Sequence, residues 1–226
     1  MQETTIKIWD EIFQNSEWGK YPNIAIIKFI AKNFYNVSSR KDIKILELGS
    51  GPGANLWFCA REGFSVYALD GSETAMNKLI ERFRKEDLLD NLKATKIGDY
   101  YTTIEEFEDE TFDAIIDMES LYCNPFDRTH EIIQKCFKKL KSNGVMLSVT
   151  FTNDTYGLEG KEIDYHAVLP TVGPMANMGF GRFVTKDDIQ KLYKLANNTI
   201  TNIQRQELHL ENNKAIKEWI IEIQKH

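Results

Sequence analysis

The stretch that decides the fold is Ile45-Leu46-Glu47-Leu48-Gly49-Ser50-Gly51-Pro52-Gly53-Ala54-Asn55. Its apolar beginning predicts a buried strand over residues 43–48, and residues 55–62 predict the helix that follows. The glycines between them permit a positive φ and let a ligand approach the backbone, while free N–H groups at the helix start face the crevice beyond the strand. A turn that only packs the helix against the strand is the alternative. The stretch therefore predicts a strand, a tight turn and a helix that together bind a nucleotide-like ligand.

Two acids indicate which ligand this turn binds. Asp70 closes the next predicted strand, 21 residues after Gly49, where a carboxylate accepts hydrogen bonds from both ribose hydroxyls of an adenosine. Glu47 lies two residues before the first glycine, where an acid disfavours a pyrophosphate and favours the cationic amino acid portion of a sulfonium nucleoside. Gly49, Gly51 and Ala54 also satisfy the dinucleotide pattern G-x-G-x-x-G/A, so a nicotinamide-dependent oxidoreductase stays open as an alternative.

Strand and helix patterns alternate along most of the chain. Short apolar or β-rich runs predict strands at residues 43–48, 64–69, 92–97, 112–117, 145–151, 199–210 and 215–224. Helical periodicity predicts helices at residues 3–14, 23–35, 55–62, 72–86, 127–140 and 185–195. The last two strands suit an antiparallel hairpin joined by Glu211-Asn212-Asn213. The pattern predicts an α/β fold, with two N-terminal helices and a doubly wound, mostly parallel seven-stranded sheet that has helices on both faces.

A length of 226 residues fits one domain of this architecture. Within it we expect a helical cover over residues 1–38, a cofactor-binding core over 40–151 and a C-terminal helix and hairpin over 183–226. Residues 152–182 form a long stretch that is rich in turn residues, and a connection of that length is usually functional. We interpret it as a lid over the acceptor, the second molecule that binds in the site.

Composition narrows the partners. The net charge is −6 and the lysines are scattered among acids, so no nucleic-acid partner is expected. The cysteines form no C-x-x-C pair and the histidines have no i,i+3 or i,i+4 partner, which predicts neither a disulfide framework nor a metal site. No apolar run approaches the roughly 20 residues of a membrane span and no targeting segment is visible, so we expect a cytoplasmic monomer or homodimer.

The chain resembles the class I, Rossmann-like S-adenosylmethionine-dependent methyltransferase family, whose first motif, E/D-x-G-x-G-x-G, is matched by Glu47-Leu48-Gly49-Ser50-Gly51-Pro52-Gly53. The resemblance continues through residues 68–72, 98–100 and 112–117. It also covers Leu140-Lys141-Ser142-Asn143-Gly144, which is similar to an LKPGG turn with asparagine in place of the proline. Trp18-Gly19-Lys20-Tyr21-Pro22 resembles a W-G-x-Y-P segment of small bacterial members, in which the opening helices fold over the cofactor.

This resemblance implies S-adenosylmethionine as cofactor, S-adenosylhomocysteine as product and no metal. Glu47 and the glycine loop would hold the methionine part, Asp70 the ribose and Asp99 the adenine amino group. Asp117 and Met118 would border the sulfonium. The complete set of expected cofactor-binding residues is Trp18, Tyr21, Glu47, Gly49, Ser50, Gly51, Gly53, Asn55, Asp70, Gly71, Ser72, Asp99, Tyr100, Asp117 and Met118.

Methyl transfer from a sulfonium mainly requires alignment and exclusion of water, and a base only where the acceptor loses a proton. Glu119, Tyr122 and His166 are the candidates for that proton transfer, although each also suits a packing or surface position. Tyr156 and Arg182 are the candidates for acceptor binding, and Arg182 would clamp an anionic group.

We therefore expect O- or N-methylation of a small molecule, such as a sugar or a polar biosynthetic intermediate. The absence of a D/N-P-P-Y tetrad after the fourth strand argues against nucleobase and glutamine acceptors. A non-catalytic subunit that binds the cofactor is the third alternative, because fold and function separate readily.

Overall fold

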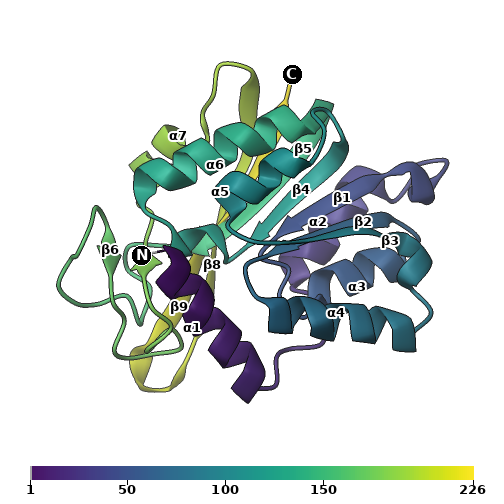
Figure 1. Cartoon of the computed structure of the whole chain (residues 1–226). Helices are drawn as coiled ribbons and strands as arrows, with labels where there is room; N and C mark the ends of the chain where they lie inside the picture. The colour runs from purple at the N-terminus through teal and green to yellow at the C-terminus, as the bar shows by residue number, and fades with distance from the viewer. Residues whose placement is uncertain (1) are drawn as a thin grey trace.

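The sheet has the strand order β3-β2-β1-β4-β5-β9-β8 in the computed structural model, which describes residues 2–226 (Figure 1). Its strands are β1 Lys44–Leu48, β2 Ser65–Asp70, β3 Leu92–Ile97, β4 Phe112–Met118, β5 Leu140–Phe151, β8 Asn198–His209 and β9 Ala215–Lys225. The first five strands pair in parallel, whereas β9 runs antiparallel to β5 and β8 antiparallel to β9. The predicted seven-stranded sheet and its C-terminal hairpin are therefore confirmed.

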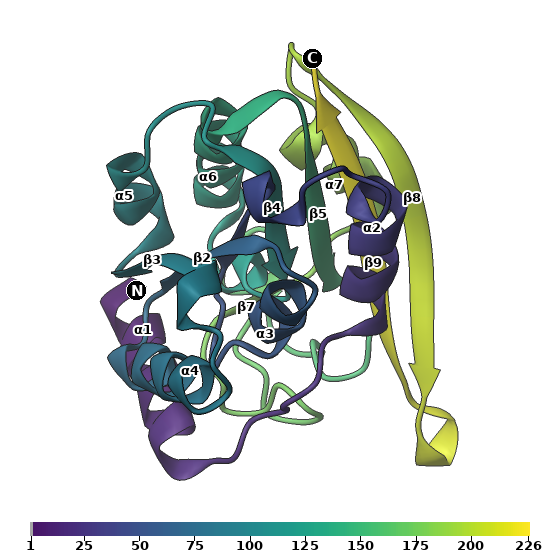
Figure 2. The same cartoon turned by 90° about the vertical axis from the view of Figure 1, so that its right-hand side faces the viewer.

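The helices cover both faces of this sheet (Figures 1 and 2). They are α1 Gln2–Asn15, α2 Ile24–Phe34, α3 Ala54–Arg61, α4 Glu73–Lys85, α5 Tyr100–Thr103, α6 Phe126–Lys139 and α7 Lys186–Tyr193. Short 3-10 helices occur at η1 Arg40–Asp42, η2 Leu89–Asn91, η3 Ile104–Glu106, η4 Leu121–Cys123 and η5 Glu211–Asn213. The two predicted N-terminal helices are confirmed, and α5 is an addition to the predicted set.

Two cores lie on opposite faces of the sheet. Leu46 and Leu48 of β1 pack toward α6 and α7, whereas Ile45 packs toward α2, α3 and α4. This alternation follows from the two-residue period of a strand, and it requires apolar residues at nearly every position of a strand that is covered on both faces. α1 packs instead along α4, at the carboxyl ends of the parallel strands (Figure 2).

β5 begins five residues before the predicted strand, because the turn at Ser142-Asn143-Gly144 lies inside it. Asn143 has a φ of +64°, and the pairing of β4 with β5 shifts register between Phe112 and Ala114. The turn is thus a bulge that leaves the strand direction unchanged.

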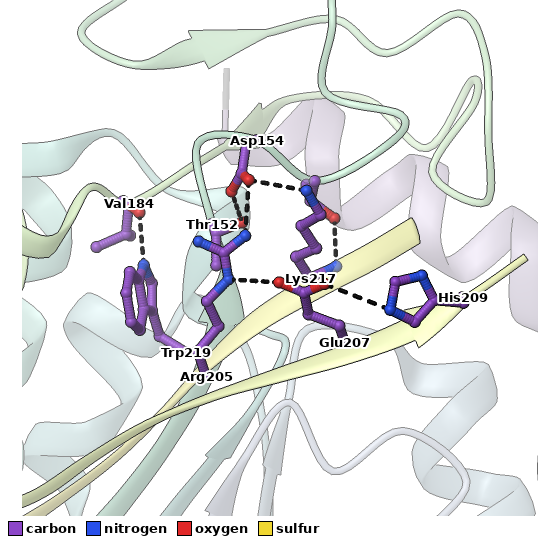
Figure 3. A network of polar contacts seen from close by, with 9 residues as sticks. Thr152, Asp154, Val184, Arg205, Glu207, His209, Lys217 and Trp219 are labelled. Carbon is purple, nitrogen blue, oxygen red and sulfur yellow. Dashed lines mark hydrogen bonds and ion pairs between the residues drawn. The ribbon is translucent and has the colours of Figure 1, made fainter. Parts of the chain in front are cut away.

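Residues 152–182 contain a small second sheet that the sequence did not predict, made of β6 Ala167–Val168 and β7 Gly181–Arg182. The start of the segment is fixed to the hairpin by Asp154, whose Oδ2 accepts from Arg205 at 2.7 Å and from Lys217 at 2.8 Å (Figure 3). Among residues 2–226, no helix combines the length and the apolar character of a membrane span.

Candidate active site

A cavity of about 460 Å³ lies at the carboxyl ends of β1, β2 and β4. This volume falls within the range of roughly 300–1,000 Å³ that is usual for small-molecule sites. Its position is where the strand order reverses between β1 and β4, the place at which open α/β sheets bind their ligands. Of the residues predicted to bind the cofactor, those that line the cavity are Trp18, Tyr21, Glu47, Gly49, Ser50, Gly51, Asn55, Asp70, Gly71, Ser72, Asp99, Tyr100 and Met118.

The turn after β1 depends on glycine for both conformation and space. Gly49 has a φ of +67°, and a Cβ at this position would lie 2.3 Å from Cβ of Ser120. Gly53 has a φ of +83° and precedes α3, and a Cβ there would lie 2.7 Å from Cγ of Leu79 on α4. Gly49 therefore shapes the cavity wall, whereas Gly53, which does not line the cavity, lets α3 begin against α4.

Asp70 joins the ends of two neighbouring strands. Its Oδ2 accepts from the N–H of Gly51 at 2.7 Å and its Oδ1 accepts from the N–H of Ser72 at 2.8 Å. Burial raises the pKa of Asp70, although these backbone hydrogen bonds act in the opposite direction. Because each carboxylate oxygen has two lone pairs, both oxygens keep acceptor capacity for a ligand in the cavity.

Glu47 is a buried carboxylate with one unsatisfied oxygen. Its Oε1 accepts from Nδ2 of Asn55 at 2.7 Å, whereas Oε2 has no hydrogen-bond partner in the described part of the chain. Burial raises the pKa of Glu47 to about 8, although the hydrogen bond from Asn55 acts the other way. A buried acceptor without a partner costs free energy unless a ligand supplies a donor. The site thus fits an ammonium group.

The far side of the cavity is closed by α5 and α1. Asp99 caps α5 by accepting from the N–H of Tyr101 at 2.9 Å and also forms an ion pair with Arg128. On α1, Oδ1 of Asp10 accepts from Oγ of Ser72 at 2.6 Å. α1 is thereby attached directly beside Asp70, at the start of α4.

Comparisons with known proteins agree with this geometry. A family profile described as a methyltransferase domain matches residues 45–144. An uncharacterized methyltransferase of Bacillus subtilis is 25% identical over 169 residues, which are 74% of this chain and 62% of that relative's length. A ubiquinone biosynthesis O-methyltransferase of Rickettsia typhi is 26% identical over 196 residues, 86% of this chain and 72% of the relative. Residues 45–144 thus match a methyltransferase domain, as the sequence predicted.

Solved structures share the fold of this methyltransferase. One, described as S-adenosylmethionine-dependent methyltransferases from Methanosarcina mazei, gives a TM-score of 0.69 at 20% identity and covers 87% of this chain and 96% of its own. A putative sarcosine dimethylglycine methyltransferase from Galdieria sulphuraria gives 0.66 at 15% identity, with 98% of each chain covered. The predicted fold and enzyme class are confirmed, the matched domain agrees with the predicted family, and the nicotinamide alternative is set aside.

Asp117 lies beneath the methyltransferase cavity and not in its wall. Its Oδ1 accepts from the N–H of Ser120 at 3.1 Å and of Leu121 at 2.9 Å, and its Oδ2 accepts from Oγ of Ser148 at 2.5 Å. These contacts fix the turn that follows β4. Asp117 therefore positions its neighbours, and Met118 is the residue of the pair that reaches the cavity.

Glu119 and Tyr122, two of the predicted proton-transfer residues, line the cavity. Glu119 has a φ of +53°, and its N–H donates to the carbonyl of Val149 at 3.0 Å. Burial raises the pKa of Tyr122 well above its ordinary value, so that its hydroxyl stays protonated. Burial and the neighbouring Glu218 raise the pKa of Glu119 as well, so this carboxyl group also favours its protonated form.

His166 lies outside the cavity wall. Its ring stacks between Tyr165 and Phe183, with centroids 4.1 and 4.9 Å away. Its Nδ1 lies 2.8 Å from Oδ2 of Asp188, the residue that completes the capping box of α7. The two ring contacts and the contact with Asp188 are sufficient to explain the position of His166, and none of them involves the cavity.

The two predicted acceptor-binding residues also lie outside the wall. The hydroxyl of Tyr156 accepts from Lys214 at 2.9 Å. Arg182 is fully buried, and its Nε donates to the carbonyl of Asn124 at 3.1 Å. The segment 152–182 reaches the cavity through Pro174, Met175 and Met178 instead.

The sequence did not identify several other residues that line the cavity, above all Trp9, Phe13, Phe151 and Ile216. Trp9 and Phe13 belong to the apolar face of α1, which was recognised as a helix face and not as a wall of the site. Within residues 2–226, no three histidine, cysteine, aspartate or glutamate residues are grouped so that they could hold a metal ion.

Proposed function

We propose that this protein transfers a methyl group from S-adenosylmethionine to an oxygen or nitrogen atom of a small molecule. The single observation that carries the proposal is the unpartnered Oε2 of Glu47, buried in the wall of a cavity that the glycine turn and Asp70 also line. When bound, S-adenosylmethionine supplies an electrophilic methyl group on a sulfonium. The ammonium group of its amino acid part suits an unsatisfied carboxylate better than the pyrophosphate of a dinucleotide does.

The residues assigned to the cofactor divide by chemistry. Glu47 would accept a hydrogen bond from the ammonium group. Asp70 would accept from the ribose hydroxyls through the lone pairs that the N–H groups of Gly51 and Ser72 do not use. Asp99, which lines the cavity beside α5, is assigned to the adenine end. Arg128 forms an ion pair with Asp99 and so fixes the position of this carboxylate.

The chain contributes orientation, exclusion of water and a place for a proton. α1 and the segment around Met175 cover the cavity, so that the acceptor is held in a low-dielectric space. The proton that an O–H or N–H acceptor loses passes to Glu119 when this carboxyl group is ionised, and its raised pKa makes the ionised form a stronger base. Tyr122 keeps its proton and serves as a hydrogen-bond donor.

We further propose that the protein acts in the cytoplasm, as a monomer or homodimer, and not on nucleic acid. The net charge of −6 supports the last point. Tyr156, His166 and Arg182 receive no direct role in this proposal, because none of them lines the cavity.

Calorimetry with S-adenosylhomocysteine tests the proposal. We expect saturable one-to-one binding, and a loss of at least about tenfold in affinity for Glu47→Gln. Glu131→Gln, which removes the same charge from the exposed face of α6, is the matched control and keeps the affinity of the wild type. Absence of binding by S-adenosylhomocysteine and S-adenosylmethionine, together with thermal stabilisation by NAD, would overturn the proposal. Binding without turnover over a broad acceptor panel would support the non-catalytic alternative.

A further inference from the structure

The cavity has an apolar end, away from the glycine turn, which we call the acceptor chamber. Its members come from five parts of the chain, and all five belong to one packed cluster: Trp9, Tyr122, Phe151, Met175 and Ile216. Tyr122 and Phe151 meet edge to face, with ring centroids 4.9 Å apart. Aromatic and thioether side chains favour a flat apolar body and offer few hydrogen bonds to a sugar.

The charged side chains of the cavity wall are all acidic. Within the described chain, the wall contains Glu47, Asp70, Asp99 and Glu119 and no lysine, arginine or histidine. Asp99 has a cationic partner in Arg128. An anion that enters this cavity finds no cationic side chain in the wall to pair with, and its burial in a low-dielectric space therefore costs free energy.

Arg182 is not a member of the cavity wall. It is fully buried, and its Nε donates to the carbonyl of Asn124 at 3.1 Å. Its Nη2 donates to Oγ1 of Thr129 at 3.3 Å, and its Nη1 is buried without a hydrogen-bond partner in the described chain. Two of its three nitrogens therefore contact η4 and α6, and none of them lines the cavity.

Of the four acids in the cavity wall, Glu119 is the nearest along the chain to a member of the acceptor chamber, three residues before Tyr122. Its carboxyl group hydrogen bonds to that of Glu218, which lies on β9 opposite Phe151. Burial and this neighbour raise the pKa of Glu119 well above its ordinary value. The Glu218 carboxyl group beside it disfavours ionisation of Glu119, which therefore keeps a proton more readily than an exposed glutamate does.

We propose that the acceptor is a flat, apolar ring compound without negative charge, whose O–H or N–H group hydrogen bonds to the Glu119–Glu218 pair. The chamber binds the ring, and the pair both orients the donor and rejects carboxylates and phosphates. Glu218, which stands behind Glu119, is a positioning residue in this arrangement. The inference rests on the proposed function and specifies the acceptor class of the same site.

The test uses the full chain saturated with S-adenosylhomocysteine and three probes at neutral pH: 2-naphthol, its anionic analogue 2-naphthoate, and glucose. We expect calorimetry to show that 2-naphthol binds at least about tenfold more tightly than either of the others. In the double variant Glu119→Gln with Glu218→Gln, the preference for 2-naphthol over 2-naphthoate falls to about threefold or less, because the carboxyl pair that disfavours an anion is gone. Glu108→Gln, an exposed acid outside the cavity, keeps the preference of the wild type.

A second variant tests the same site in case the double variant does not fold. Ile216→Lys places a cation at the edge of the chamber and is expected to strengthen 2-naphthoate binding at least about fivefold. Leu208→Lys, its exposed cross-strand partner on β8, leaves that affinity unchanged. If S-adenosylhomocysteine binds but 2-naphthol does not, or if 2-naphthoate or glucose binds as tightly, the acceptor class is wrong and the methyltransferase function stands. If S-adenosylhomocysteine does not bind, both proposals fall.

Discussion

The N–H of Gly51 donates to Oδ2 of Asp70 across 2.7 Å, and this contact joins the turn after β1 to the end of β2. One carboxylate therefore shapes the glycine turn and also lines the cavity. This contact explains why the chain has both an acid at the end of β2 and glycines after β1, because the acid accepts from the backbone of the glycine turn. The turn has its binding conformation because the acid holds it.

Asp70→Ala is expected to lower the affinity for S-adenosylhomocysteine by at least about tenfold, or roughly 1.4 kcal/mol. The variant loses the acceptor for the ribose hydroxyls and releases the N–H groups of Gly51 and Ser72. Calorimetry measures the affinity, and a thermal melt separates lost contacts from lost folding. Asp164→Asn, a change at an exposed acid in the segment 152–182, is the control. A loss of less than about tenfold would show that the ribose assignment is wrong.

Gly49→Ala is expected to lower cofactor affinity at least about tenfold, because its Cβ would lie 2.3 Å from Cβ of Ser120 and force the turn to move. Gly63→Ala is the matched control. Gly63 has a similarly positive φ of +93°, but a Cβ there meets nothing closer than 3.8 Å. Both variants share the conformational penalty of roughly 1–2 kcal/mol, and only the first also closes the cavity. Equal cofactor affinities in the two variants would contradict this account.

The sequence predicted the fold because the information that decides it is local. Ile45, Leu46 and Leu48 are apolar on both faces of one short strand, and such a run, followed by glycines, belongs to a parallel sheet covered by helices. The same holds for Asp70, which is placed by its spacing from Gly49. Contacts between neighbouring strands then follow from the handedness of the crossovers.

The apolar end of the cavity was not predicted from the sequence, because it is assembled from distant segments. Trp9, Phe151 and Ile216 lie on three elements that meet only in the folded chain, and each has the pattern of an ordinary core residue. His166 and Arg182 were singled out because histidine and arginine often bind or react. Their partners, Asp188 and Asn124, engage both side chains, and nothing in the local sequence marks these pairings.

Asp154→Asn is expected to loosen the segment 152–182 while changing global stability by about 1 kcal/mol or less, because the side chain is partly exposed. Although burial acts the other way, hydrogen bonds from Lys217, Thr152 and Arg205 hold the pKa of Asp154 below its ordinary value, so the carboxylate is charged at neutral pH (Figure 3). Hydrogen exchange measures the opening of the segment.

Glu207→Gln is the matched control for this change, since Glu207 accepts from the same arginine at 2.9 Å but lies on the hairpin (Figure 3). We expect faster exchange in residues 155–180 for Asp154→Asn and no change there for Glu207→Gln. Identical exchange in the two variants would mean that Asp154 does not anchor the segment.

Glu47 makes the stability of the ligand-free protein depend on pH. Its pKa is about 8 in the folded chain against 4.5 for the ordinary group, so the folded state binds the extra proton. The resulting stabilisation is fully present below about pH 4.5 and is lost as the pH rises through about 8, with a slope of at most about 1.4 kcal/mol per pH unit. Urea titrations of wild type and Glu47→Gln at each pH measure the free energy of unfolding of both proteins. The difference between the two isolates the contribution of Glu47, because Asp70, Asp117 and Glu119 are present in both.

The proton on Glu47 makes cofactor binding depend on pH in the opposite direction. An ammonium ligand binds the ionised carboxylate, so the affinity for S-adenosylhomocysteine should rise by up to about tenfold per pH unit from about pH 6 to 8, with release of the proton from Glu47. Calorimetry in buffers of different ionisation enthalpy measures that proton directly. In Glu47→Gln the affinity is lower, and the share of the pH dependence that comes from Glu47 disappears. An affinity in the wild type that stays constant over this range would show that Oε2 of Glu47 does not bind the ammonium group.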